Sequence, residues 1–226
     1  MKPKNLKCPF TWEQRKPVLQ NKVLYVPEYY DKHAEWEMPA FDHHDFFGNS
    51  NEVFIEYCSG NGLWIAEQAQ KNPHINWIAV EHDFERVRRV WAKINNYNLS
   101  NLIVVSGEAL MFTRYYLADC SISRMYMNFP DPWPKRKHAK NRLVQRPFVE
   151  EITRILKEGA QAIFVTDDEV YMQQISSEIR AHPLWKPSYP EPFFITDWPE
   201  YGNSSFDVLW RKKGKTIHYL QFEKKS

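Results

Sequence analysis

The amino-acid sequence predicts an α/β fold in which a mostly parallel sheet carries helices on both faces. Short apolar runs alternate with segments whose apolar residues recur about every 3.6 positions, as in successive β-α units. A last run, 216–222, alternates apolar and polar residues and predicts a final antiparallel strand. The other strands are expected at 53–57, 77–80, 102–105, 125–127 and 160–165, and the helices at 63–71, 84–96, 148–156 and 170–180.

The chain of 226 residues is long enough for one α/β domain with added segments. Residues 1–50 are rich in Pro, Tyr, His and Asp and show weak periodicity, so we expect an irregular or partly helical N-terminal extension there. The alternating pattern begins after this segment. Residues 51–226 are therefore expected to form the main domain.

Composition and charge exclude several classes of protein. The formal net charge is only +2, so binding to nucleic acid has to come from clustered cations rather than from bulk charge. Residues 1–14 lack the apolar segment of a signal peptide, and no run approaches the roughly 18 apolar residues of a membrane span. The cysteines lie far apart without a C-x-x-C motif, which disfavours disulfides and zinc and favours the cytoplasm. These cysteines are Cys8, Cys58 and Cys120.

Three polar features follow the first three strands of the main domain. The turn 56–62 contains two glycines that let a ligand approach the backbone closely. Glu81 follows the next strand, where a carboxylate can accept both ribose hydroxyls of a nucleoside. A polar side chain in the segment 106–109 can reach an adenine edge. Together they predict a nucleoside site at the turn with Gly60 and Gly62, at Glu81 and at a polar residue of 106–109.

A dinucleotide cofactor, and with it a dehydrogenase, is the competing interpretation of this turn. Its fingerprint, G-x-G-x-x-G, needs a third glycine for close packing of helix on strand. Counted from Gly60, that position is Ile65. S-adenosylmethionine carries a nucleoside but no phosphates, and it fits the pattern better.

The segment 128–134, Asn-Phe-Pro-Asp-Pro-Trp-Pro, is the most informative in the chain. Its three prolines fix the backbone without a helix or a strand. Asn128 and Asp131 on such a frame lose little entropy when they engage a ligand. Trp133 offers a ring on which a base can stack. We call this segment the reactive loop.

A basic cluster follows the reactive loop directly. Five of the eight residues 135–142 are Lys or Arg. Such a cluster can bind phosphates, which supply affinity and orientation in complexes with nucleic acid. The backbone contacts are expected from Lys137, His138, Lys140 and Arg142. No metal site is expected, because the adjacent His43 and His44 have only Asp45 near them.

These residues together resemble the bacterial tRNA (guanine-N7)-methyltransferase family. The resemblance covers roughly residues 50–222 and rests on the glycine turn, on Asn-Phe-Pro-Asp-Pro-Trp-Pro-Lys with its basic continuation, and on Val165-Thr166-Asp167. It implies a Rossmann-like fold that binds S-adenosylmethionine. It also implies that the substrate is tRNA, methylated on the guanine at position 46 of the variable loop. Residues 1–50 are then expected to be an extension that contacts tRNA.

The resemblance also implies roles for single residues. It places Glu56, Glu81, Glu108 and Asp131 at the cofactor, and it makes Asp131 the catalytic residue. Lys135 and Asp167 fall on substrate-binding positions. A late family motif, T-x-Y-E, corresponds loosely to Ser204, Phe206 and Asp207 and their neighbour at 205.

The chain departs from the family pattern at four positions. Cys58 stands where the first glycine of the turn is expected, at a place where a positive φ or a close ligand favours glycine. Glu108 replaces an aspartate and is one methylene longer. Phe206 lacks the tyrosine hydroxyl of the late motif, and Asp207 is shorter than its glutamate.

The chemistry of guanine N7 simplifies the expected mechanism. N7 has a lone pair and no proton, so the reaction needs alignment and charge stabilisation rather than a general base. Asp131 and Asp167 are both candidates for these tasks, and the sequence leaves their division open. The expected partner is tRNA, with no membrane and no obligate protein partner, and the chain is expected to be a monomer or a homodimer.

Two other functions remain open from the sequence. One is a methyltransferase that acts on another base or on an amine, because related loops serve exocyclic amines and glutamine. The other is a non-catalytic tRNA-binding protein that has lost its cofactor, which Cys58 and the altered late motif would support.

Overall fold

The computed structural model describes residues 1–202 and 204–225. The chain divides into two compact units, an N-terminal unit of residues 1–118 and a C-terminal unit of residues 119–226. This division differs from the boundary expected at residue 50, because residues 1–50 pack within the N-terminal unit. No helix in the described residues is both long enough and apolar enough to cross a membrane.

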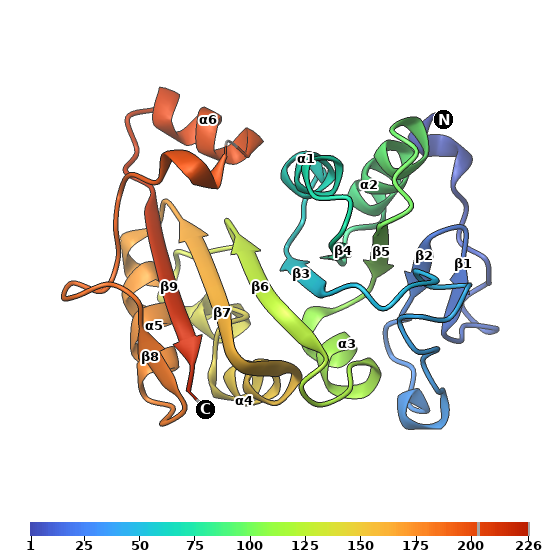
Figure 1. Cartoon of the computed structure of the whole chain (residues 1–226), viewed down its shortest axis with the longest axis horizontal. Coiled ribbons are helices and arrows are strands. Elements are labelled where there is room, and N and C mark those ends of the chain that lie inside the picture. Colours follow the sequence, from blue (N-terminus) through green and yellow to red (C-terminus); the bar gives the residue numbers. More distant parts are fainter. Residues whose placement is uncertain (203, 226) are drawn as a thin grey trace. The chain divides into compact units, whose positions relative to one another are not determined.

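Three parallel strands with following helices form the centre of the N-terminal unit (Figure 1). The apolar runs in the sequence become β3 (Val53–Tyr57), β4 (Asn76–Glu81) and β5 (Leu102–Ser106), and β4 lies between the other two. Nearly every side chain of these strands is buried, as expected for a parallel sheet covered by helices. The helices are α1 (Leu63–Lys71), α2 (Phe84–Asn96) and α3 (Ala109–Tyr116).

The N-terminal fifty residues extend this sheet, which the sequence did not indicate. β1 (Val18–Gln20) and β2 (Val23–Tyr25) form an antiparallel hairpin, and β2 pairs in parallel with β5. Asn21 and Lys22 both have positive φ, 53° and 63°, as a two-residue type I′ turn requires. Strands of three residues are too short to show a period of two, so only the structure reveals them. Two short 3-10 helices complete the segment, η1 (Pro3–Asn5) and η2 (His33–Glu35).

A buried histidine attaches this segment to α3. The Nδ1 atom of His33 lies 2.6 Å from the hydroxyl of Tyr116, and the His33 ring stacks on Tyr115 with centroids 5.5 Å apart. Burial lowers the pKa of His33, so its neutral form is favoured. The segment 1–50 is thus held by side-chain packing as well as by the strand pairing of β2.

The C-terminal unit contains the second group of strands, in the order β6-β7-β9-β8. β6 (Ile122–Asn128) and β7 (Leu156–Thr166) are parallel, whereas β9 (His218–Lys224) runs antiparallel to β7 and to β8 (Trp185–Pro187). The expectation of a final antiparallel strand is therefore confirmed. The helical segments are η3 (Arg136–Asn141), α4 (Arg146–Ile155), α5 (Glu169–Arg180), η4 (Pro199–Tyr201) and α6 (Ser205–Lys212).

The expected helices at 63–71, 84–96, 148–156 and 170–180 are confirmed as α1, α2, α4 and α5 to within two residues. The sequence reading missed α3 and α6. Both helices have eight residues, so their apolar positions repeat over barely two turns.

The turn between β3 and α1 is built from left-handed residues. Cys58, Gly60 and Gly62 have φ of 60°, 55° and 67°. A Cβ on Gly62 would lie 2.7 Å from Val90 of α2, so this position excludes any other residue for two reasons. Cys58 holds the same backbone conformation with a side chain, which costs about 1–2 kcal/mol.

Replacing Cys58 with glycine should therefore stabilise the fold. We expect Cys58→Gly to raise the free energy of unfolding by about 1 kcal/mol relative to Cys58→Ala, because only glycine relieves the strain at positive φ. Urea denaturation of the two variants measures this difference, and the alanine variant controls for the lost thiol. Equal stabilities would show that the turn carries no strain at Cys58.

Candidate functional site

Glu81 connects the glycine turn to the end of β4. Its carboxylate is almost fully buried, and Oε2 accepts the N–H of Gly60 at 2.9 Å while Oε1 accepts the N–H of Asp83 at 2.9 Å. Nδ1 of His82 lies 3.3 Å from Oε1, and Nη1 of Arg86 lies 3.8 Å from Oε2. The structure thus brings together Gly60 and Glu81, and a ribose hydroxyl would have to share the Glu81 oxygens with these neighbours.

Glu56 lies near the carboxyl end of β3, where all five strand residues are buried. Its carbonyl accepts the hydroxyl of Ser59 at 3.0 Å, which fixes the start of the glycine turn. Glu56 pairs in register with Ala79 of β4, two residues before Glu81. The two glutamates therefore lie toward the same end of neighbouring strands.

Glu108 caps a helix in this structure. Its carboxylate accepts the N–H groups of Leu110 at 3.0 Å and Met111 at 2.7 Å, so it serves as the N-cap of α3. The extra methylene relative to aspartate still permits this geometry. An adenine contact at this position would have to use the lone pairs that the cap leaves unoccupied.

A cavity of about 370 Å³ lies beside the ends of β4 and β5 within the N-terminal unit. Its size falls in the range of small-ligand sites. His82, Ser106 and Gly107 border it at the strand ends, where an adenine was expected. A Cβ on Gly107 would lie 2.7 Å from Val26, so glycine permits the N-terminal segment to pack here. That segment supplies further walls that the sequence reading missed, among them Phe10, Trp12 and Tyr25.

These features fit S-adenosylmethionine. Two left-handed glycines open the backbone, and Glu81 joins this turn to the end of β4. The cavity borders Ser106 and Gly107, and none of the five residues expected at the cofactor is among its lining residues. Ile65, where a dinucleotide-binding turn has glycine, is fully buried in α1. The residues that could hold this cofactor are Glu56, Gly60, Gly62, Glu81 and Glu108.

The reactive loop begins at the end of β6, in the C-terminal unit. Phe129 and Trp133 have φ of 51° and 43°, and each precedes a proline. Non-glycine residues adopt this conformation only where the surroundings enforce it. The N–H of Phe129 donates to the carbonyl of Val165 at 2.8 Å, which ties the loop to β7. Asp131 is exposed between these fixed points.

Arg142 supports the reactive loop instead of facing solvent. Its side chain is only 7% exposed, and its Nε donates to the carbonyl of Pro132 at 2.7 Å. Its Nη1 donates to Gln174 at 2.6 Å, and its guanidinium lies 5.2 Å from the centre of the Tyr171 ring. The expectation that Arg142 contacts phosphate is therefore wrong, because its buried side chain supports the reactive loop.

Three lysines of the cluster do reach solvent. Lys135, Lys137 and Lys140 are exposed along η3, as a phosphate-binding role requires. His138 is half-buried, and its ring meets that of Trp133 edge to face at 5.8 Å. The structure thus separates one buried arginine from three exposed lysines that the sequence presented as one cluster.

Asp167 follows β7 at the end of the sheet where the reactive loop leaves β6. Asn128 and Val165 are register partners, so Asp167 lies just beyond the strand pair from which Asp131 also follows. The side chain of Asp167 is 16% exposed, and its Oδ2 lies 3.5 Å from Nζ of Lys215. Lys215 comes 48 residues later in the chain, so its proximity to Asp167 could not be inferred from the sequence alone.

The late segment 204–207 is mostly internal. The hydroxyl of Ser204 accepts the N–H of Asp207 at 3.0 Å, which makes Ser204 the N-cap of α6. Asp207 is 2% exposed and binds Arg211 at 2.7 Å and the hydroxyl of Tyr219 at 2.6 Å. A direct guanine contact is therefore not what Asp207 provides in this structure. Burial, followed by the Asp207 hydrogen bond, raises the pKa of Tyr219 to about 12, so Tyr219 stays a donor.

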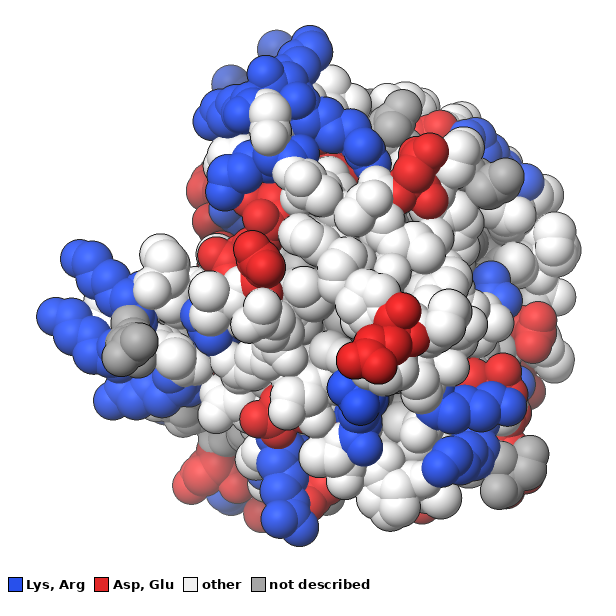
Figure 2. Space-filling view, turned by 90° about the vertical axis from the view of Figure 1, so that its left-hand side faces the viewer, with Lys and Arg blue, Asp and Glu red and all other residues white. Residues whose placement is uncertain are grey.

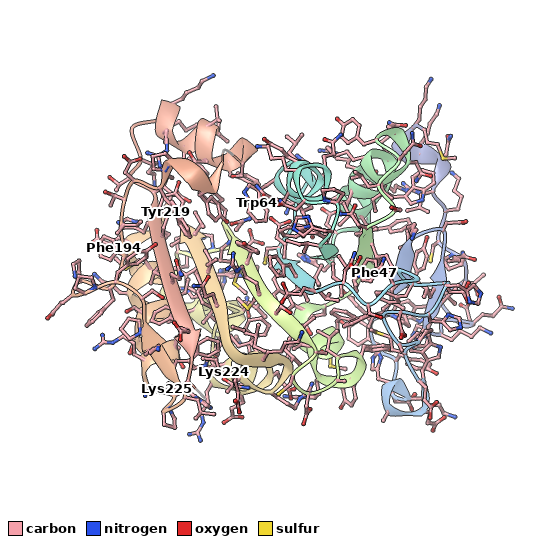
Figure 3. All side chains as sticks on the ribbon, viewed as in Figure 1. Phe47, Trp64, Phe194, Tyr219, Lys224 and Lys225 are labelled. Carbon is pink, nitrogen blue, oxygen red and sulfur yellow. The ribbon has the colours of Figure 1, made fainter. Side chains whose placement is uncertain are left out.

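Aromatic contacts connect this late segment to the reactive loop. The Phe206 ring lies 5.9 Å from that of Phe129, and the hydroxyl of Tyr201 donates to Oδ1 of Asn128. Tyr201 also packs against Tyr219, labelled on β9 in Figure 3, at 5.3 Å. Tyr201, Arg211 and Tyr219 were missed by the sequence reading, because no motif or spacing connects them to Asn128 or Asp207.

His43, His44 and Asp45 lie close together but offer little to a metal. Their ligand atoms lie within 4.8 Å of one another, and all three residues are exposed. Nδ1 of His43 accepts the N–H of Asp45 at 3.2 Å, so one ligand atom is already engaged.

Comparison with known proteins gives the family of the chain. A family model described as "Putative methyltransferase" matches residues 50–220. The tRNA (guanine-N(7)-)-methyltransferase of Chlamydia abortus is 46% identical over 225 residues, which cover 100% of this chain and 99% of the relative. That of Thermotoga maritima is 27% identical over 206 residues, 87% of this chain and 66% of the relative.

Solved structures show the fold. The 16S rRNA methyltransferase KamB superposes with a TM-score of 0.61 at 13% identity and covers 84% of this chain and 96% of its own. A structure described as an antibiotic-related methyltransferase gives a TM-score of 0.56 at 17% identity and covers 80% and 90%. The fold is thus the α/β methyltransferase fold that the sequence predicted. The 46% identity to the Chlamydia abortus enzyme extends over the whole of this chain, and the family model matches residues 50–220. This chain therefore belongs to the tRNA (guanine-N7)-methyltransferase family.

Proposed function

We propose that this chain transfers the methyl group of S-adenosylmethionine to N7 of the guanine at position 46 in the variable loop of tRNA. Membership of the family carries the reaction and the substrate class. The exposed Asp131 on a rigid loop, followed directly by exposed lysines, is the structural observation that supports it best. The reaction would take place in the cytoplasm, with the enzyme as a monomer or a homodimer.

The cofactor would be held by the N-terminal unit. S-adenosylmethionine supplies an electrophilic methyl group on a sulfonium. Glu81 would accept the ribose hydroxyls with its remaining lone pairs, and Gly60 and Gly62 would allow close backbone approach. Glu56 and Glu108 would complete the carboxylate set around the site.

The guanine would be oriented by carboxylates. N7 attacks through its lone pair, so no proton has to leave it and the demand on the protein is alignment. The base becomes cationic as it is methylated, and a nearby carboxylate stabilises that charge. We propose Asp131 for this role and for contact with the cofactor. Asp167 and Lys135 would hold the base and its nucleotide, with Ser204, Phe206 and Asp207 forming the supporting wall through α6.

The lysines of η3 would bind the tRNA backbone. Lys137 and Lys140 are exposed and follow the reactive loop, so phosphates bound there would position the nucleotide beside Asp131. His138 would hold Trp133 edge-on, which orients that ring for stacking on a base.

The first test is transfer of labelled methyl from S-adenosylmethionine to bulk unmodified tRNA, followed by nucleoside analysis. We expect 7-methylguanosine as the product and its loss in tRNA whose guanine 46 is replaced by adenosine. A different methylated nucleoside would assign the enzyme to another base. Absence of both transfer and cofactor binding would favour a tRNA-binding remnant.

Replacement of Asp131 separates catalysis from binding. We expect Asp131→Ala to lower the rate of methyl transfer at least about 100-fold while tRNA still binds, because the lost carboxylate acts on the charge formed during transfer. Single-turnover rates and filter binding measure the two quantities. Glu158→Gln, which removes an exposed carboxylate near the start of β7, serves as the control. An undiminished rate would exclude a catalytic role for Asp131.

Neutralising the lysines of η3 should change the salt dependence of binding. We expect Lys137→Gln/Lys140→Gln to weaken tRNA binding and to reduce the slope of log K against log salt by about 1 to 2, since each phosphate contact contributes about 0.7–0.9. Titrations between about 50 and 200 mM salt measure the slope. An unaltered slope would show that these lysines are only solvated.

A further inference from the structure

A second basic cluster lies at the end of α6. Four of the five residues 211–215 are Lys or Arg, and all of them are exposed. Figure 2 shows Lys and Arg side chains gathered over this end of the C-terminal unit, where Figure 1 places α6. The cluster begins 70 residues after the end of η3, so it is separate in the sequence from the lysines of η3.

Two of these four cations have a carboxylate partner, although both are exposed. Arg211 binds Asp207 at 2.7 Å and the hydroxyl of Tyr219 on β9 at 3.0 Å. Nζ of Lys215 lies 3.5 Å from the carboxylate of Asp167. These contacts fasten both ends of the segment to the sheet, beside the carboxylate that we assign to guanine.

The other two cations face outward. Among the side chains that the structure describes, none forms an ion pair with Lys212 or Lys213, and both lysines are exposed. Lys213 lies with its Nζ 4.6 Å from the centre of the Trp210 ring, which places its charge without neutralising it. The Trp210 ring therefore limits where the charge of Lys213 can lie, and both lysines are exposed to an anionic partner.

Apolar side chains share the surface with these lysines. Val208 and Leu209 are 40% and 41% exposed, and Lys212 follows them by four and three positions, so all three lie on one face of α6. The carboxyl end of a helix by itself repels anions. An anionic partner must therefore be attracted by the side chains, and a partner with both apolar and anionic groups fits the surface best.

We propose that Val208, Leu209, Lys212 and Lys213, which we call the α6 surface, bind the sugar-phosphate backbone of tRNA as a second contact region. Lys215 beside Asp167 and Phe206 beside Phe129 connect α6 to both segments assigned to guanine. An RNA strand that presents its guanine to those segments passes within reach of the α6 surface. This inference rests on the proposed function.

The test is tRNA binding by Lys212→Gln/Lys213→Gln. We expect the Kd for unmodified tRNA to rise about tenfold near 50 mM salt, and the salt slope to fall by about 1 to 2. Combination with the η3 double variant should lower the slope further, since the two regions would bind different phosphates. Thermal unfolding of each variant shows whether it folds.

The matched control is Lys157→Gln/Lys225→Gln. Both lysines are exposed in the same unit, and they lie near the start of β7 and just beyond the end of β9. In Figure 3, Lys225 lies at the opposite end of β9 from Tyr219 and α6. We expect this pair to leave affinity and slope unchanged.

Three results would overturn the proposal. Equal losses in the α6 and control variants would indicate a general charge effect. An unchanged slope in the α6 variant would exclude phosphate contacts, and a change in oligomeric mass instead would identify the surface as a protein interface. If the wild type neither binds nor methylates tRNA, the proposed function fails. If the wild type is active and the α6 variant binds normally, only this inference fails.

Discussion

In each unit, the structure is constrained most by the edge at which the parallel strands end, because backbone N–H groups there need hydrogen-bond acceptors. Helices that start there expose N–H groups without intrahelical partners, and those groups must be satisfied. Asp83, Glu108, Asp168 and Ser204 each accept such N–H groups at the start of a helix. Each cap contributes about 0.5–2 kcal/mol. The main structural role of these polar side chains is therefore to hold the loops of the candidate site in place.

Glu81 and Asp207 show how this constraint shapes function. Glu81 satisfies backbone donors from two loops, and the side chains of His82 and Arg86 approach its two oxygens. Asp207 gives its carboxylate to Arg211 and Tyr219 and so fixes α6 on β9. A buried carboxylate without such partners would be costly. Its contacts with Arg211 and Tyr219 therefore explain how Asp207 is accommodated where the family resemblance leads us to expect a glutamate.

The cations of the C-terminal unit divide in the same way. Arg142 and Arg211 are engaged internally and position the reactive loop and α6. The lysines of η3 and of the α6 surface are exposed instead, and we propose that they supply the charge that meets RNA. These lysines lie in the same unit as Asp131 and Asp167.

The sequence by itself determined six of the strands, the helices α1, α2, α4 and α5, the glycine turn and the reactive loop, because local periodicity and proline content encode them. It also located Cys58 at a position that proved to be left-handed. It could not show that β2 pairs with β5, that Arg142 is buried under Pro132, or that Lys215 meets Asp167. Those contacts join residues distant in the chain, so only tertiary packing decides which charges are buried and which remain free.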